Sequence, residues 1–139
     1  MSEVKIKIEN LYKIFGPRAK EYTDKVKSGI DKDELLAKYN HVLGLDNINL
    51  DIKEQSIQVV MGLSGSGKST LIRHINRLIE PTEGTVLVDG EDITKLNKAD
   101  LLEFRRNKTG MVFQRFALFP HHNILDNVQF GLSIKNLDK

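Results

Sequence analysis

The residues best suited to chemistry are Gly62-Leu63-Ser64-Gly65-Ser66-Gly67-Lys68-Ser69, followed by Thr70. They form the pattern Gly-x-x-x-x-Gly-Lys-Ser, a phosphate-binding loop whose backbone amides surround a polyphosphate. Glycines at 62, 65 and 67 allow backbone angles and a close approach that side chains would block. The sequence therefore predicts a polyphosphate site over residues 62–70.

Each polar group of this loop has its own expected role. The amides of residues 67–70 would lie at a helix N-terminus, where unpaired N–H groups and the helix dipole favour an anion. Lys68 would reach the β and γ phosphates, and the Ser69 hydroxyl would bind Mg²⁺. A dinucleotide-binding fingerprint is a poor alternative because Thr70 stands where its third glycine would be.

The motif needs a strand before it and a helix after it. Residues 57–61 are apolar apart from Gln58, which predicts a buried strand. Beyond the loop, apolar residues recur on one helical face: Leu71, Ile72, Ile75, Leu78 and Ile79. This strand–loop–helix context is the one in which the motif binds phosphate.

The preceding residues predict strands at 4–9 and 45–52, and a further strand follows at 85–88. Residues 17–41 resemble a helical insertion between the first two strands. Pro17 suits a first helical turn, and Asp31 with Glu34 resembles a capping box. Asp89-Gly90 predicts a tight turn, which we prefer to a metal-binding acid at a strand end.

Asn97 and Asp100 predict the start of a helix that continues through Phe104. The stretch 97–100 also matches the guanine-specificity signature Asn-Lys-x-Asp. We reject that use because no fully buried strand precedes it and it follows the phosphate loop too closely. The basic residues at 105, 106 and 108 suit the negative end of this helix, and a basic binding patch is the alternative.

Residues 111–113 predict a short strand that ends at Gln114. This side chain would ligate Mg²⁺ or orient a water, or it is an ordinary polar residue at a strand end. His121 and His122 are adjacent, and no Cys or third His gives a metal-binding spacing. Asn123 predicts the start of a last helix.

Composition limits the class of protein. The 139 residues fit one domain, and 40% of them are apolar. A net charge of +2, with Lys and Glu interspersed, does not favour nucleic acid as a partner. No stretch approaches the ~20 apolar residues of a membrane span, and we see no secretory signal. The absence of Cys excludes disulfides and thiol metal sites.

Taken in order, several landmarks resemble the ATP-binding subunit of ABC transporters, and most of all the importers of glycine betaine and proline betaine. The resemblance covers essentially the whole chain. It is carried by the insertion and by four motifs: Tyr12-Lys13-Ile14-Phe15-Gly16, Met61 to Thr70, Ile79 to Gly84, and Val112-Phe113-Gln114 with Phe116 to His121.

The resemblance implies a role for each matching residue. Phe15 corresponds to the aromatic residue that stacks on adenine, and Tyr12 is the second choice. From the residues alone, the alternative is that this aromatic is a rim residue of the core. Lys68 and Ser69 match the phosphate and Mg²⁺ roles, and Gln114 matches the glutamine that ligates Mg²⁺ and senses the γ-phosphate. The stretch 116–127, with Phe116 and Phe119, matches the region that contacts the transmembrane permease.

The fold expected from the resemblance is α/β: a P-loop NTPase, specifically the N-terminal part of an ABC nucleotide-binding domain, with an antiparallel β subdomain and an incomplete parallel sheet. ATP and Mg²⁺ are the implied cofactors. The implied partners are a permease and a second ATP-binding subunit, at the cytoplasmic face of the plasma membrane. The family's signature loop, Walker B Asp and catalytic Glu have no counterpart in the sequence, so we expect these residues alone to hydrolyse ATP poorly or not at all. A non-catalytic nucleotide-binding or permease-docking module is the alternative.

Overall fold

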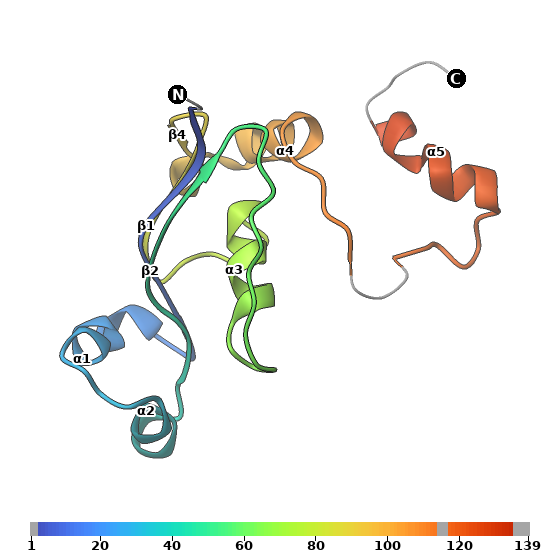
Figure 1. Ribbon diagram of the computed structural model, residues 1–139. Coiled ribbons are helices and arrows are strands. Elements are labelled where there is room, and N and C mark those ends of the chain that lie inside the picture. Colours follow the sequence, from blue (N-terminus) through green and yellow to red (C-terminus); the bar gives the residue numbers. More distant parts are fainter. Residues whose placement is uncertain (1–2, 114–116, 135–139) are drawn as a thin grey trace. The chain divides into compact units, whose positions relative to one another are not determined.

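A computed structural model describes residues 3–113 and 117–134, which form two compact units that divide after Leu96 (Figure 1). The first unit contains a four-stranded sheet in the order β2-β1-β3-β4, in which every neighbouring pair is antiparallel. The strands are β1 (Val4–Phe15), β2 (Val42–Lys53), β3 (Glu83–Val88) and β4 (Glu91–Asp92). The predicted antiparallel β subdomain is therefore confirmed.

Strand β1 is longer than predicted. A bulge breaks the alternation of apolar and polar residues, so the sequence pattern stops before the strand does. Asn10 adopts a left-handed backbone conformation with φ of 47°, and its amide donates to Asn49 Oδ1 at 2.9 Å. The register shifts there, so that Leu11 and Tyr12 are both buried. The strand continues beyond this point and pairs Phe15 with Val42.

Three short helices lie between β1 and β2, at one end of that strand pair (Figure 1): η1 (Ala19–Tyr22), α1 (Thr23–Lys27) and α2 (Lys32–Tyr39). Asp31 caps α2 by accepting a hydrogen bond from the Asp33 amide. Glu34 does not complete the predicted capping box and instead pairs with Lys38 at 2.5 Å. Val26 and Leu35 from these helices join a buried cluster with two residues of β1, Tyr12 and Ile14.

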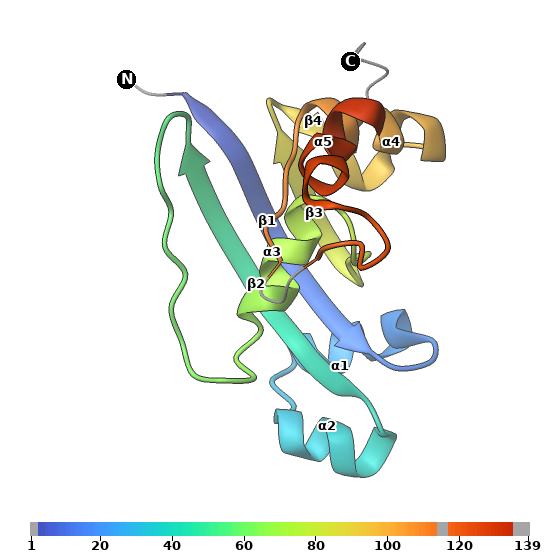
Figure 2. The same cartoon turned by 90° about the vertical axis from the view of Figure 1, so that its right-hand side faces the viewer.

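The predicted strand at 57–61 is wrong. These residues form an extended loop between β2 and the next helix, visible in Figure 2, and they are assigned to no strand. Ile57 and Met61 are 93% and 87% exposed. An apolar run becomes a strand only when neighbouring strands accept and donate its backbone hydrogen bonds. Among the described residues none pairs with this segment, so the expected parallel sheet is absent from them as well.

The helix after the phosphate loop, α3 (Lys68–Ile75), is shorter than its apolar pattern predicted. It buries Leu71, whereas Ile72 is 46% exposed and Leu78 lies beyond its end. The turn predicted at Asp89-Gly90 is confirmed, since it joins β3 to β4 with φ of 52° and 79°. The Asp89 carboxylate lies 2.6 Å from Lys5 Nζ. A short turn of helix, η2 (Ile93–Lys95), ends this unit.

The second unit contains α4 (Lys98–Asn107) and α5 (Ile124–Ile134). The predicted caps are confirmed: the Asn97 side chain accepts from the amides of Ala99 and Asp100, and Asn123 accepts from the Asp126 amide. The strand predicted at 111–113 is wrong. This segment has no regular structure, and Val112 is 98% exposed.

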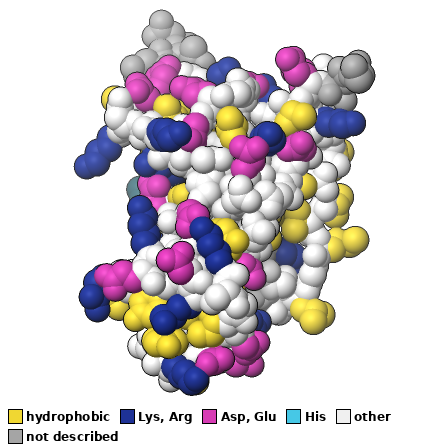
Figure 3. All heavy atoms as spheres, turned by 90° about the vertical axis from the view of Figure 1, so that its left-hand side faces the viewer, with side chains coloured by type: hydrophobic (Ala, Val, Ile, Leu, Met, Phe, Trp, Pro, Cys, Tyr) yellow, Lys and Arg dark blue, Asp and Glu magenta, His cyan; other side chains and the backbone are white. Residues whose placement is uncertain are grey.

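One face of the molecule carries interspersed basic and acidic side chains, with a hydrophobic group at its lower end (Figure 3). The two signs are mixed on this face, so its charges do not form a patch of one sign. Among the described residues, several opposite charges are paired, such as Lys27 with Glu83 and Lys7 with Glu9. Exposed pairs of this kind contribute little to stability.

Thr82 attaches the segment after α3 to the end of β1. Its hydroxyl accepts from the Ile14 amide at 2.9 Å and donates to the Ile14 carbonyl at 3.3 Å, and its own amide donates to the Tyr12 carbonyl at 2.9 Å. Thr82 is 7% exposed. The hydroxyl therefore satisfies two buried backbone groups one residue before Phe15.

We expect Thr82→Val to lower the free energy of unfolding by about 1–3 kcal/mol, because the Ile14 amide would lose its buried partner. Urea unfolding followed by circular dichroism measures this change. The matched control is Thr85→Val, at a half-buried strand position, for which we expect a change within about 0.5 kcal/mol. Equal effects of the two substitutions would contradict the role given to the Thr82 hydroxyl.

Candidate functional site

The loop of residues 62–67 leads directly into α3. Gly67 precedes the helix with φ of 90°, in the left-handed region that favours glycine, and no side chain caps the helix. The first amides of a helix have no partner within it. The amides of Lys68, Ser69 and Thr70 therefore lie at a helix N-terminus, as the sequence predicted, and a helix N-terminus favours an anion.

The Lys68 ammonium group is held inside this loop. Lys68 Nζ donates to the carbonyl oxygens of Gly62 at 2.7 Å and Leu63 at 2.6 Å, and it lies 3.4 Å from Ser66 Oγ. A turn, in which the Ser66 amide donates to the Leu63 carbonyl at 3.2 Å, closes the loop. The loop thus combines a positive charge with a helix N-terminus, which is a favourable place for phosphate.

Phe15 lies in the same pocket as this loop. A cavity of about 240 Å³ is lined by residues 65–70 and by Phe15, Val42, Leu43 and Gly44. Phe15 is 38% exposed at the end of β1, so its ring is accessible, whereas Tyr12 is only 6% exposed and belongs to the core. The structure thus brings together an aromatic ring and a phosphate loop that lie about 50 residues apart in the sequence.

Two of the predicted residues, Gln114 and Phe116, lie outside the described residues. The described part of the chain contains no group of three His, Cys, Asp or Glu that is arranged to hold a metal ion. Ser69, at the start of α3 and in the pocket wall, therefore remains the described candidate for a magnesium ligand.

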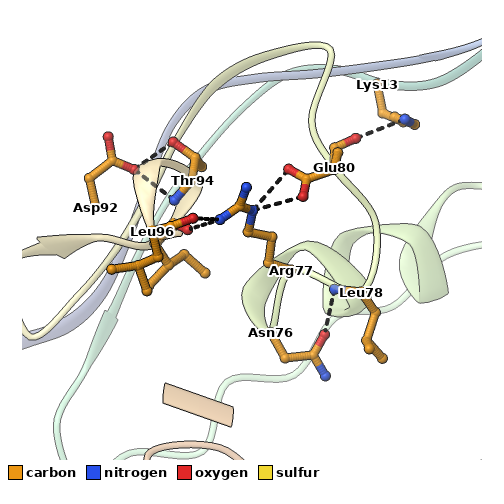
Figure 4. Close-up of polar contacts among 9 residues, drawn as sticks. Lys13, Asn76, Arg77, Leu78, Glu80, Asp92, Thr94 and Leu96 are labelled. Carbon is orange, nitrogen blue, oxygen red and sulfur yellow. Dashed lines mark hydrogen bonds and ion pairs between the residues drawn. The ribbon is translucent and has the colours of Figure 1, made fainter. Parts of the chain in front are cut away.

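A polar network that the sequence analysis did not predict fixes the end of α3 (Figure 4). Arg77 Nε donates to both carboxylate oxygens of Glu80 at 2.9 Å, and Nη1 donates to the carbonyl oxygens of Ile93 and Leu96 at 3.1 and 2.6 Å. The Glu80 carbonyl accepts from Lys13 Nζ at 2.7 Å. This network ties the turn after α3 to β1 and to η2.

Lys13 also contacts the aromatic ring of the pocket. Its Nζ lies 5.0 Å from the centroid of Phe15, a distance at which a cation is attracted to the ring. Partial burial lowers the pKa of Lys13, and the charge of Glu80 opposes this shift. The side chain therefore links the ring of Phe15 to the turn at Glu80.

His74 is the other residue that sequence reasoning missed. It is 1% exposed on α3, and its Nδ1 donates to the Thr70 carbonyl at 2.7 Å. The second ring nitrogen, Nε2, is buried as well. Helical spacing gave a signal, since position 74 lies one turn from Leu71 on the same face. Burial lowers the pKa of His74, and the charge of Lys13 lowers it further.

Comparison with known proteins identifies the family. A family model described as "ABC transporter" matches residues 45–139, which is more than half of the chain. The chain belongs to the ABC transporter family. The resemblance inferred from the sequence motifs is therefore confirmed.

The most similar relatives include two osmolyte-transport proteins. The glycine betaine/proline betaine transport system ATP-binding protein ProV of Escherichia coli (strain K12) is 49% identical over 135 residues, covering 97% of this chain and 34% of that protein. The glycine betaine transport ATP-binding protein OpuAA of Bacillus subtilis (strain 168) is 46% identical over 136 residues, covering 98% of this chain and 32% of that protein. The chain thus spans about a third of the length of these curated relatives.

A solved structure gives the same assignment. The ATP-binding cassette MJ0796, determined as a dimer in a post-hydrolysis state bound to ADP and Pi, is 35% identical with a TM-score of 0.72. The match covers 94% of this chain and 47% of that chain. The predicted α/β fold of an ABC ATPase cassette, present here in part, is confirmed.

The second unit of this ABC family member contains an apolar pocket in the predicted permease-contact region. Its volume is about 400 Å³, and its walls include Leu118, Phe119, Pro120, Ile124 and Val128. The Phe119 ring packs against Phe130, with ring centroids 4.6 Å apart, and remains 36% exposed. No helix within the described ranges is long and apolar enough to span a bilayer.

The lowered pKa of His74 predicts that stability falls in acid. Below the ordinary value of 6.5 the unfolded chain takes up a proton that the folded chain does not, so the free energy of unfolding decreases as the pH falls from there towards the lower folded value. Above pH 7 this contribution is constant.

The measurement is the melting temperature of the wild-type chain and of His74→Leu between pH 8 and pH 5. We expect the difference between the two melting temperatures to be constant above about pH 7. Below about pH 6.5 the melting temperature of the wild type should fall relative to that of His74→Leu, because leucine takes up no proton. A difference that stays the same over the whole range would show that the burial of His74 is not linked to protonation.

Proposed function

We propose that this chain provides the ATP-binding part of a subunit that energises an ABC importer for osmolytes such as glycine betaine and proline betaine. One observation carries the nucleotide part of this proposal: Phe15 and the phosphate loop line a single pocket. The solute class rests on relatives that are 46–49% identical and whose names state glycine betaine transport.

In the proposed site, the adenine of ATP stacks on Phe15 and the phosphates lie on residues 64–70. Ser64, Gly65, Ser66 and Gly67 contribute backbone amides, and Thr70 extends the helix N-terminus. Lys68 exchanges the loop carbonyls that it now contacts for phosphate oxygens and offsets their charge. An ammonium group on a flexible stem is suited to this exchange.

The residues fit a magnesium nucleotide. The Ser69 hydroxyl, on the first turn of α3, would hold Mg²⁺ together with oxygens of the nucleotide, and Gln114 would be its second ligand from this chain. Bound Mg²⁺ would neutralise charge on the β and γ phosphates. Lys68 and Gln114 are the residues of this chain to which we give catalytic roles.

The proposed partners follow from the family. The subunit would pair with a second copy of itself, with ATP between the two copies, and it would dock on a transmembrane permease through the region that includes Phe119. This arrangement would place it as a peripheral protein at the cytoplasmic face of the plasma membrane. No role in nucleic-acid binding is proposed, since the net charge is only +2.

Calorimetric titration with Mg-ATP tests the nucleotide part of the proposal. We expect Lys68→Ala to weaken ATP binding at least about tenfold, because a charge-assisted contact with phosphate is lost. Lys95→Ala, which removes an exposed lysine paired with Asp92, is the matched control and should leave binding unchanged. Equal ATP affinity of wild type and Lys68→Ala would refute the site.

Uptake of labelled glycine betaine by cells tests the solute class. Disruption of the gene should abolish uptake that is restored by the wild-type gene and not by its Lys68→Ala variant. If cells without the gene still took up glycine betaine but had lost uptake of another solute, the proposed solute class would be wrong. The proposed nucleotide site would be unaffected by that result.

A further inference from the structure

Gly44 lies directly against the ring of Phe15. It occupies an irregular point of the β1–β2 register, since Lys13 pairs with Leu45 while Ile14 already pairs with Leu43. A methyl group at Gly44 would lie 2.6 Å from Cε2 and 3.2 Å from Cδ2 of Phe15. Both distances are too short for an unshifted ring, so the ring can occupy its place only because residue 44 has no side chain.

The Gly44 carbonyl oxygen closely approaches the phosphate loop. A methyl group at Gly67 would lie 2.5 Å from the Gly44 carbonyl oxygen, which shows how closely the two glycines approach. Gly44 is therefore close both to the ring of Phe15 and to Gly67, the residue that precedes α3. A side chain at position 44 would disturb the ring end of this arrangement.

We propose that Gly44 is a positioning residue that sets the separation between the base-stacking ring of Phe15 and the phosphate loop. This inference rests on the proposed nucleotide site and deepens it. A nucleoside triphosphate engages both ends at once only if that separation matches the length of its ribose and α-phosphate. Lys13, whose ammonium is bound to the Glu80 carbonyl, holds the ring by its cation–π contact.

Gly44→Ala should therefore affect the two ends of the site differently. The new methyl would displace the ring of Phe15, because the two closest atoms it meets both belong to that ring. The approach of the Gly44 carbonyl to Gly67 involves backbone atoms and would be kept. Binding of the base should weaken while binding of phosphate alone persists.

The experiment compares Mg-ATP with Mg-tripolyphosphate, which has the phosphates but no base, by calorimetric titration. For Gly44→Ala we expect the Kd for ATP to rise by about tenfold, the scale of a lost base–aromatic stack, and the Kd for tripolyphosphate to change by less than about twofold. The matched control is Gly110→Ala, where a methyl meets nothing within 4 Å and ATP affinity should be unchanged.

A double variant separates positioning from a general structural effect. If Gly44 acts through Phe15, the pair Phe15→Ala/Gly44→Ala should bind ATP as weakly as Phe15→Ala alone and no more weakly. The double variant also tests the proposal if Gly44→Ala by itself fails to fold. In the double variant the ring of Phe15, which the new methyl group would strike, is absent.

Three results would overturn the inference: unchanged ATP affinity in Gly44→Ala, a parallel loss of ATP and tripolyphosphate binding, or additive losses in the double variant. Each of these leaves the proposed function standing as long as the wild-type chain binds ATP. Failure of the wild-type chain to bind ATP would instead overturn the proposed function and this inference together.

Discussion

The antiparallel pairing of β1 with β2 is the constraint on which the candidate site depends. It brings the end of one strand, at Phe15, against Val42 and Gly44 of the other. The insertion helices secure this end by burying Val26 and Leu35 beside residues of β1. Because the phosphate loop approaches the same end of β2, a local irregularity in one strand pair determines the distance between an aromatic ring and a cationic loop.

The two ends of α3 differ in how their polar groups are satisfied. At its start no side chain caps the helix, and a lysine contacts loop carbonyls, which leaves amides for an anion. Beyond its end, Arg77 satisfies four oxygen atoms, and His74 is buried one turn earlier. Satisfied polar networks make a segment rigid. The helix is thus fixed by side-chain contacts beyond its end, whereas the amides of its first turn have no partner within the helix.

The apolar residues of the segment 57–61 illustrate what a hydrophobic pattern does not decide. They have the composition of a central strand, yet Ile57 is 93% exposed and no described strand lies beside the segment. The same is true of residues 111–113. In both places the pattern marks a segment suited to a sheet with two covered faces, and the hydrogen-bonding neighbours that would make it a strand are not supplied by the described residues.

The sequence by itself determined the chemistry and the local boundaries: the phosphate loop, the caps at Asp31, Asn97 and Asn123, and the turn at Asp89. These depend on residue types at fixed short spacings, which act through local backbone geometry. Only the tertiary structure decided that β1 continues through a bulge to Phe15, that His74 of α3 is buried while Arg77 binds Glu80 and the backbone near η2, and that Gly44 lies close to both the ring and the loop. Such contacts join residues far apart in sequence, and no local spacing encodes which backbones approach closely enough to require a glycine.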